Sequence, residues 1–327
     1  MIARLAALLA AGLAWLGRYG TQGFALSILL GLALPQFSAA ARPLLPVSIF
    51  CFTTVTFMRA DVGVILGLVR RPTKLLLCAL WLVVAPVALI GGALLLTGRA
   101  TLDPGLVLGL ALLAAAPPIM SSPAVAIIYG FEPSLIIAGV IVTTLISPLV
   151  APLLVDLLAG SAVPLDRSVL TLRLLFFIGG GMAVAALLRI WLGMAKMRAM
   201  KANLDGFGVL MYFIFAVAAM DGVTRAAIAD PGKVAFFLAC AFAVSLVGIV
   251  ASYLILRPLR PSDRFMVGYG SGQRNMGLLV AALGAGVPTT TFLFFALAQF
   301  PIYLLPWLLR GVAARIRRGE QTPPAAN

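Results

Sequence analysis

Apolar residues occupy most of the chain in long runs, which short polar or charged stretches separate. A helix needs about 20 apolar residues to cross the hydrocarbon core of a bilayer. Measured against that length, ten runs could each span a membrane: 21–38, 44–60, 73–97, 104–130, 134–158, 168–192, 204–222, 232–256, 262–286 and 289–311. The pattern therefore predicts an all-α polytopic membrane protein with ten transmembrane helices.

The fourth run is interrupted by three prolines and two serines: Pro117, Pro118, Pro123, Ser121 and Ser122. Each proline lacks a backbone N–H, so carbonyl groups one turn earlier lose their hydrogen-bond partners. An unpaired polar group is costly in lipid, so the break must face protein or water. A simple proline kink capped by serines is the alternative interpretation.

The ninth run is interrupted by a glycine-rich polar segment, 268–277. The segment carries four glycines that make the backbone pliable, Gly268, Gly270, Gly272 and Gly277, and four polar side chains, Ser271, Gln273, Arg274 and Asn275. Arg274 lies near the middle of the run, where burying an arginine costs roughly 2.5–3.5 kcal/mol on insertion scales. Snorkelling of Arg274 to an interface is the alternative. We expect a non-helical segment at a water-filled crossing.

The two interruptions lie five runs apart, and an odd number of spans in each half inverts the orientation of the second half. Such inverted repeats place paired broken helices at a midplane binding site. We therefore expect four parts: an N-terminal leader or interfacial segment at 1–20, a first five-helix repeat at 21–160, a second at 161–311 and a disordered cytoplasmic tail at 312–327. A signal peptide is the alternative for the leader.

Composition agrees with lipid as the solvent, because 62% of the residues are hydrophobic and only 10% are charged. The formal charge of +14 could suggest nucleic acid. However, alternating the ten spans from a cytoplasmic N-terminus places 17 of the 24 Lys and Arg residues on the cytoplasmic side and six outside, with Arg274 within the membrane. This bias predicts an inner-membrane protein with both termini in the cytoplasm, and it explains the charge without nucleic acid.

Few residues offer catalytic or metal-binding chemistry. The chain has no histidine, and its three cysteines stand far apart within apolar runs. No two acidic residues lie within five positions of each other, as a membrane transferase that binds Mg²⁺-diphosphate would require. We expect no enzyme activity and no cofactor, although a membrane enzyme remains a competing class.

The fifth run adds hydroxyl groups at similar depth: Thr143, Thr144 and Ser147. Such hydroxyls commonly bond to the carbonyl four residues earlier in their own helix. Lining the crossing is the alternative hypothesis. Together with the polar residues of both interruptions, they form the predicted substrate or ion site.

The segments around both interruptions resemble the bile acid:sodium symporter superfamily. The matching positions are Pro117, Ser122, Ser147 and Pro148 in spans four and five, and Gly272, Asn275, Gly277 and Leu278 in span nine. Auxin-efflux-like and arsenite carriers share this architecture. The resemblance implies a panel domain and a core domain, with the broken helices crossing in the core and access alternating between the two sides.

Several positions depart from the family's sodium ligands. Its Glu falls at Gly270, its Gln at Arg274, its Asn at Pro123 and a Gln of span three at Leu82. Hard cations need oxygen ligands, and a guanidinium repels them. We therefore hypothesise that Arg274 takes the place of sodium and braces the crossing through nearby carbonyls and hydroxyls.

The guanidinium of Arg274 can also donate two parallel hydrogen bonds to a carboxylate. Aromatic and Met side chains could accommodate an amphipathic molecule: Met211, Tyr212, Phe213, Phe292, Phe294, Phe295 and Trp307. We expect a secondary transporter for a small organic anion or amphipathic solute. The alternatives are a sodium-dependent symporter that uses residual hydroxyl and carbonyl ligands, and a non-transporting structural or sensor protein. The sequence does not specify an oligomeric state.

Overall fold

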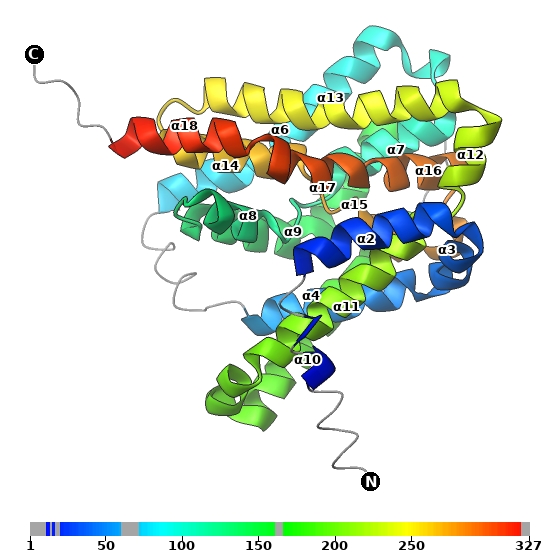
Figure 1. The fold of residues 1–327 in the computed structure, drawn as a ribbon. Coiled ribbons are helices and arrows are strands. Elements are labelled where there is room, and N and C mark those ends of the chain that lie inside the picture. The colour runs from blue at the N-terminus through cyan, green and yellow to red at the C-terminus, as the bar shows by residue number, and fades with distance from the viewer. Residues whose placement is uncertain (1–10, 14, 17–19, 60–71, 161–165, 322–327) are drawn as a thin grey trace, which may run out of the picture. The chain divides into compact units, whose positions relative to one another are not determined.

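The described part of the protein is helical throughout. The computed structural model describes residues 11–13, 15–16, 20–59, 72–160 and 166–321 (Figure 1). Within these residues there is no β-strand, and seven segments are long and apolar enough to cross a membrane: Pro35–Met58, Pro72–Thr97, Ser134–Ala159, Arg167–Gly193, Lys201–Ala229, Pro231–Ile255 and Thr289–Leu308. The chain is therefore an all-α, multi-pass membrane protein.

The chain divides into two compact units, and each draws on both predicted halves. Unit 1 comprises Met1–Ala60, Leu172–Val234 and Val280–Gly286. Unit 2 comprises Asp61–Thr171, Ala235–Leu279 and Val287–Asn327. The predicted boundary near residue 160 thus separates sequence halves rather than compact units.

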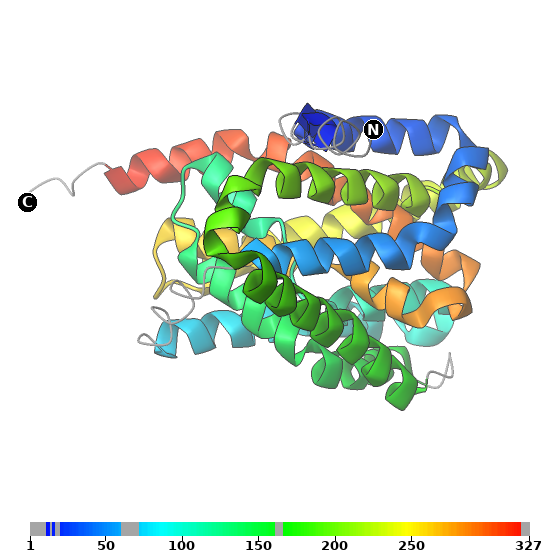
Figure 2. The same ribbon diagram turned by 90° about the horizontal axis from the view of Figure 1, so that it is seen from below.

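The described residues of unit 1 include these helical elements: α2 (Gly20–Ala33), α3 (Pro35–Ala41), η1 (Arg42–Leu44), α4 (Leu45–Arg59), most of α10 (Arg167–Ala199), α11 (Lys201–Ala219) and α12 (Val223–Ala229). α11 contacts both α2 and α4 and lies between them in Figure 2. A glycine permits the contact with α2, because a Cβ built on Gly31 would lie 2.8 Å from the Cβ of Met220. The unit also includes η4 (Gly284–Gly286) and the end of α15 (Met276–Leu283).

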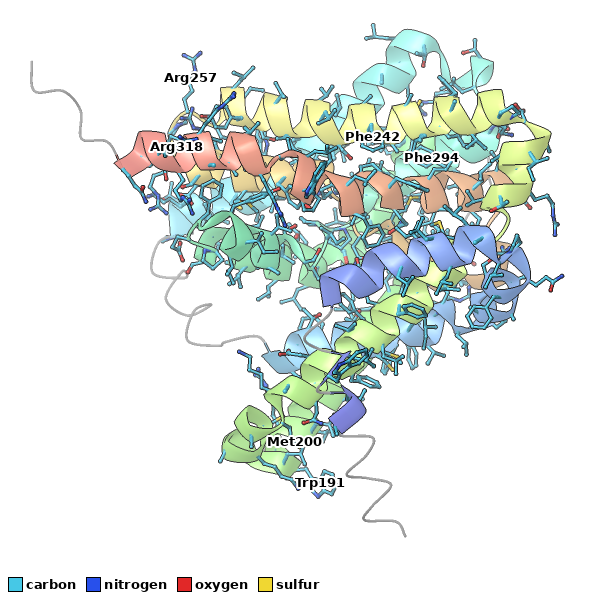
Figure 3. All side chains as sticks on the ribbon, viewed as in Figure 1. Trp191, Met200, Phe242, Arg257, Phe294 and Arg318 are labelled. Carbon is cyan, nitrogen blue, oxygen red and sulfur yellow. The ribbon has the colours of Figure 1, made fainter. Side chains whose placement is uncertain are left out.

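Polar side chains in unit 1 satisfy helix ends. Arg189 donates from Nε and Nη2 to the Met58 carbonyl, at 3.0 and 2.6 Å, near the C-terminal end of α4. Arg42 pairs with Asp221 at 2.8 Å. Near the end of α10 the backbone leaves the helical conformation at Gly193, which has φ +72°, and the neighbouring Trp191 is exposed (Figure 3). Arg189 thus supplies donors to the end of α4, and the Arg42–Asp221 pair joins the end of α3 to the turn that follows α11.

Unit 2 is built around α7 (Pro104–Ala115), which is apolar on every side and is buried from Gly105 to Ala115. A helix that is hydrophobic all round is expected to be surrounded by other helices. Contacts to α7 come from three of the unit's other elements, α6 (Pro72–Thr97), α9 (Ser134–Ala159) and α16 (Thr289–Leu297). A Cβ built on Gly109 would lie 2.7 Å from Phe294 Cδ1, so this glycine admits the phenylalanine ring.

The two interruptions divide their runs into pairs of shorter helices. α7 is followed by α8 (Ser122–Tyr129), and α14 (Pro261–Gly272) is followed by α15. α14 packs against α13 (Pro231–Ile255) through two glycines four residues apart. A Cβ on Gly268 would lie 2.8 Å from the Ile249 carbonyl oxygen, and one on Gly272 would lie 2.3 Å from that of Ser245. Small residues at this spacing let helix backbones approach closely.

The C-terminal helices follow one another as α16, α17 (Gln299–Leu308) and α18 (Arg310–Gln321) (Figure 1). The expectation of a disordered tail from residue 312 is therefore wrong as far as residue 321. α18 is amphipathic and packs on α14 and α8, with Ala313 buried, and these contacts stabilise a segment that its charge made look unstructured. Residues 322–327 of the predicted tail lie outside the described residues.

Two further predictions concern the N-terminal part of the chain. Most of the predicted leader 1–20 lies outside the described residues. The first predicted span, 21–38, is divided at Pro35, which begins α3 after Leu34 has left the helical conformation. α2 has 14 residues, which is fewer than the roughly 20 that an apolar helix needs to cross the hydrocarbon core of a bilayer.

Candidate functional site

The two interruptions meet within unit 2 through their backbones. Pro118 and Arg274 face each other as an isolated antiparallel bridge. The Ile119 N–H donates to the Gln273 carbonyl at 2.8 Å, and the Asn275 N–H donates to the Pro117 carbonyl, also at 2.8 Å. Each extended segment thus supplies the hydrogen bonds that the other lost when its helix ended.

Arg274 is 2% exposed and donates to three backbone carbonyls from three helices. Nη1 donates to Leu82 O at 2.7 Å and to Gly270 O at 3.4 Å, and Nη2 donates to Ala114 O at 3.3 Å. Every donor belongs to one guanidinium, so a single side chain joins α6, α7 and α14.

All three carbonyls have lost the usual i+4 donor of a helix. Pro86 stands four residues after Leu82, and Pro118 stands four residues after Ala114; neither proline has an N–H. Gly270 lies in the last turn of α14, which ends at Gly272. Arg274 therefore supplies the donors that prolines and a helix end have removed.

The position of Arg274 also matches the local dipoles. Ala114 and Gly270 lie in the last turns of α7 and α14, where the helix dipole is negative. Half-helix C-terminal ends and unwound carbonyls are where transporters coordinate coupling cations. Among the described residues no carboxylate lies within ion-pair distance of Arg274, so carbonyl oxygens alone oppose its charge.

Most of the predicted hydroxyl ligands bond within their own helix or turn. Ser122 Oγ donates to Ile119 O, Thr143 Oγ1 to Gly139 O, Ser147 Oγ to Thr144 O and Ser271 Oγ to Val267 O, at 2.8, 2.7, 2.8 and 3.0 Å. Two of these serines precede prolines, Pro123 and Pro148, and donate to the carbonyls four residues before those prolines, which receive no N–H from them. The Ile119 carbonyl also accepts the Ser122 N–H at 3.1 Å. The interpretation that hydroxyls of the fifth run bond within their own helix is confirmed for Thr143 and Ser147.

A small cavity of about 10 Å³ adjoins the crossing, with room for about one water molecule. Arg274 lines it together with residues of α6, α7, the first break and α9: Val83, Ala115, Ala116, Pro117, Thr143, Ile146, Ser147, Val150 and Leu154. Thr143 and Ser147 line this cavity together with Arg274, as the alternative hypothesis expects, although both hydroxyls also bond within their own helix.

Several buried polar atoms at the crossing have no hydrogen-bond partner. Both amide atoms of Gln273, which is 1% exposed, are unpaired, as are Arg274 Nε and Thr144 Oγ1. A buried polar group without a partner costs about 1–3 kcal/mol. These atoms provide two donors, an acceptor and a hydroxyl for a ligand or water at the crossing.

The remaining predicted residues do not line the cavity beside Arg274. Ser121 precedes α8 without a side-chain capping bond, and its side chain, like that of Asn275, is half-buried. Phe294 and Phe295 are buried in the packing of unit 2, whereas Trp307 is 65% exposed. None of the predicted aromatic side chains lines the cavity beside Arg274.

The space for a sodium-binding side chain at Gly270 is filled. A Cβ on Gly270 would lie 2.9 Å from Ile136 Cδ1 and 3.0 Å from Leu82 Cδ2. In the described part of the chain, no three His, Cys, Asp or Glu side chains cluster as metal ligands. The oxygens best placed to hold a cation are the three carbonyls that Arg274 already occupies.

Sequence reasoning missed the role of α6 in the site. Leu82 was noted only as a lost ligand, yet its carbonyl makes the shortest bond to Arg274. The signal was Pro86, which lies inside α6 and frees the carbonyl of residue 82.

A comparison with family models and with curated proteins found no match for this chain.

Proposed function

We propose that this chain is a secondary transporter that moves a small organic anion across the membrane by alternating access. In this proposal Arg274 stands where the resembled symporter family binds a coupling sodium ion. The single observation that carries the proposal is a guanidinium that is buried at the crossing of two broken helices and bonded to carbonyls. Broken helices at such a crossing are a recurrent feature of transporter binding sites.

The chemistry of the crossing favours an anionic solute. The full charge of Arg274 has no carboxylate counterpart among the described residues. An uncompensated buried charge is costly, and an anion that approaches it relieves that cost. α8 and α15 also begin at the crossing, and helix N-termini favour negative charge. The unpaired Gln273 amide would add a donor to the same ligand.

The helix inventory is consistent with ten spans. Seven apolar segments of spanning length, the two interrupted pairs α7/α8 and α14/α15, and α2 together make ten. We infer two five-helix repeats of opposite orientation, with both termini in the cytoplasm of an inner membrane. Unit 2, which carries both interruptions, would correspond to the family's core domain, and unit 1 to its panel domain.

In this conformation the cavity is too small for an organic anion. Its volume of about 10 Å³ accommodates one water. The solute would therefore enter only after the crossing has been opened to one side, as alternating access requires. This expectation predicts that ligand binding changes the accessibility of residues that line the cavity, such as Ile146 and Val150.

The alternative is sodium coupling through residual ligands. Thr143 and Ser147 line the cavity, and their hydroxyl oxygens would contribute to the cation site in this alternative. Two mechanisms are compared: transport with Arg274 in place of the ion, and sodium-coupled transport. The purified protein is first screened for thermal stabilisation by a panel of small carboxylates, in NaCl and in choline chloride. Stabilising carboxylates are then tested for uptake into proteoliposomes under the same two salts.

We expect uptake of at least one carboxylate that is equal in Na⁺ and in choline, and that is lost in Arg274→Gln but kept in the distant control Gln299→Leu. Uptake that requires Na⁺ would favour the sodium-coupled alternative. If no carboxylate stabilises the protein and Arg274→Gln only lowers stability, then Arg274 has a structural role and the transport proposal fails.

A further inference from the structure

α18 presents two faces of different chemistry. Ala313 is buried and Ile316 is half-buried, whereas Arg315 and Arg318 are exposed. Residues two positions apart on an α-helix point about 200° away from each other. Arg315 and Arg318 therefore lie opposite the face that packs on α8 and α14.

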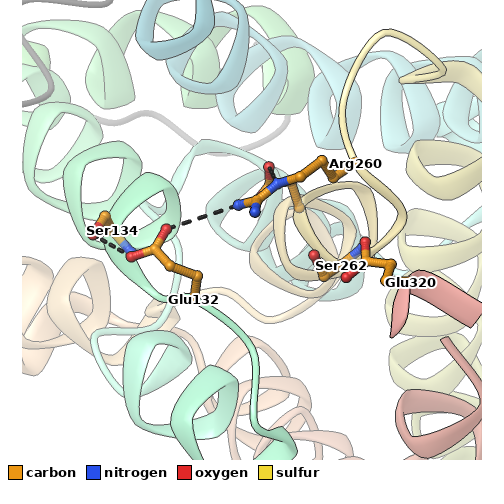
Figure 4. A network of polar contacts seen from close by, with 6 residues as sticks. Glu132, Ser134, Arg260, Ser262 and Glu320 are labelled. Carbon is orange, nitrogen blue, oxygen red and sulfur yellow. Dashed lines mark hydrogen bonds and ion pairs between the residues drawn. The ribbon is translucent and has the colours of Figure 1, made fainter. Parts of the chain in front are cut away.

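The inward face joins the ends of both interrupted helices. Glu320 Oε1 accepts the Ser262 N–H at 2.8 Å, in the first turn of α14 (Figure 4). Arg317 lies against Gly130, where α8 ends, so that a Cβ on Gly130 would lie 2.5 Å from Arg317 Nη1. A carboxylate thus meets the positive end of one helix, and a guanidinium meets the negative end of the other.

A second link connects the same two ends directly. Arg260 forms an ion pair with Asp263 at 3.0 Å and a longer one with Glu132 at 3.9 Å (Figure 4). The Asp263 carboxylate raises the pKa of Arg260 above its ordinary value. Glu132 follows α8, and Asp263 lies in α14, so charged contacts around α18 hold the two elements together.

The outward face continues a surface that lies in lipid. Helical hydrogen bonding runs through the junction of α17 and α18, because Leu309 N–H donates to Leu305 O and Ala313 N–H donates to Leu309 O, both at 2.9 Å. One stripe therefore passes at helical spacing from exposed apolar residues to arginines: Leu304, Trp307, Leu308, Val312, Arg315 and Arg318.

This order of residues matches the cross-section of a membrane surface. Tryptophan is enriched at the level of lipid headgroups, and arginine is enriched just beyond it on the cytoplasmic side. Arg315 lies about 10 Å beyond Leu308 along a helix with a rise of 1.5 Å per residue. Figure 3 shows Arg257 and Arg318 at the same end of unit 2, so the turn after α13 adds a further exposed arginine there.

We propose that the outward face of α18 binds the phosphate of an anionic phospholipid through Arg315 and Arg318, with Trp307 and Leu308 against its acyl chains. The inward face would transmit this binding, because the same helix holds the ends of α8 and α14. The bound lipid would then stabilise unit 2 by favouring the docked helix. A nucleic acid or a soluble anion would leave the apolar part of the stripe without a partner.

The full-length protein in neutral detergent can be titrated with phosphatidylglycerol or phosphatidylcholine, with binding followed by native mass spectrometry and stability by thermal unfolding. Phosphatidylglycerol should bind more tightly and raise the unfolding temperature. Each arginine near an anionic surface contributes about 1 kcal/mol, so Arg315→Gln with Arg318→Gln should weaken binding by about 25-fold. The charge-preserving pair Arg315→Lys with Arg318→Lys should retain it.

The matched control is Arg225→Gln, an exposed arginine of α12 that the charge distribution assigns to the other side of the membrane. It should bind phosphatidylglycerol as the unchanged protein does. Inorganic phosphate should neither bind nor compete at the same concentration. Equal affinity for the two lipids, or unchanged phosphatidylglycerol binding in the double Gln variant, would overturn the proposal. Neither readout uses transport, so a failure here leaves the transport proposal to its own test.

Discussion

Replacing Arg274 with glutamine removes the buried cation and leaves its three carbonyl partners in place. These are Leu82 O, Gly270 O and Ala114 O, at 2.7, 3.4 and 3.3 Å from the guanidinium nitrogens. If Arg274 substitutes for a coupling ion, these oxygens become a site where a hard cation can bind. We therefore expect the variant Arg274→Gln to gain a response to Na⁺ that the unchanged protein lacks.

The magnitude follows from the three bonds. The short bond from the charged donor to Leu82 O is worth about 1.5–3 kcal/mol, and the two longer ones about 0.5–1.5 kcal/mol each. Because the variant no longer buries a guanidinium, it avoids a cost of about 2.5–3.5 kcal/mol. The variant should therefore be less stable by about 1 kcal/mol, which corresponds to a fall in Tm of about 2–4 °C for the unfolding of unit 2, which has 197 residues.

Sodium should reverse this loss. A site with a Kd of about 10 mM would add about 1.8 kcal/mol of stability at about 200 mM Na⁺. At about 2–4 °C for each kcal/mol, the Tm of Arg274→Gln should rise by about 4–7 °C in NaCl relative to choline chloride. The Tm of the unchanged protein should be the same in both salts.

Thermal unfolding of purified protein in the two salts is the assay. Arg274→Lys keeps the positive charge and should not respond to Na⁺, which separates charge from loss of packing. Gln299→Leu is the matched control, since it removes a buried side chain whose Nε2 donates to Phe295 O at 3.0 Å, away from the crossing. A Na⁺-dependent rise in the unchanged protein, or none in Arg274→Gln, would refute the reasoning.

Three further predictions concern the same unit. Gln273→Leu removes a buried amide that has no hydrogen-bond partner, so it should raise Tm by about 2–4 °C, equivalent to about 1 kcal/mol. The same variant should be stabilised less by carboxylates. A fall in Tm would show that the amide is satisfied. Gly270→Ala places a Cβ 2.9 Å from Ile136 Cδ1 and should cost about 1–3 kcal/mol of unfolding free energy. In the double variant with Leu82→Ala, the total loss should be smaller than the sum of the two single losses. A total equal to that sum would contradict the packing argument. Arg260→Gln should cost about 0.5 kcal/mol of unfolding free energy, equally at all pH values between about 6 and 10. The raised pKa of Arg260 keeps this arginine protonated throughout that range in the folded chain, and it is protonated there in the unfolded chain as well. A cost that changes within this range would contradict the argument.

The sequence predicted the elements of unit 2 more closely than their packing. The prolines at 117, 118 and 123 and the segment 268–277 marked both interruptions, because lost N–H donors and charge do not fit an uninterrupted membrane helix. Arg274 was identified from its depth alone. Its partners could not be, because Leu82 and Ala114 look like ordinary apolar residues and contribute only backbone oxygens.

Local composition also gave one wrong expectation. The tail after residue 311 is rich in arginine and was expected to be disordered, yet α18 is ordered by contacts to α8 and α14. Those contacts involve Gly130 and Ser262, which are far from α18 in the sequence. A charge pattern shows which side of a membrane a segment prefers, but not which distant helix ends it can cap.

The sequence by itself determined that the protein is helical, that it lies in a membrane and where two of its helices break, because these properties depend on local hydrophobicity and on missing backbone donors. Only the tertiary structure decided that the breaks exchange hydrogen bonds at Pro118 and Arg274. Only it showed that one guanidinium satisfies carbonyls freed by Pro86 and Pro118. Each proline specifies that a carbonyl needs a new donor, whereas the identity of that donor depends on which chain segment the fold brings beside it.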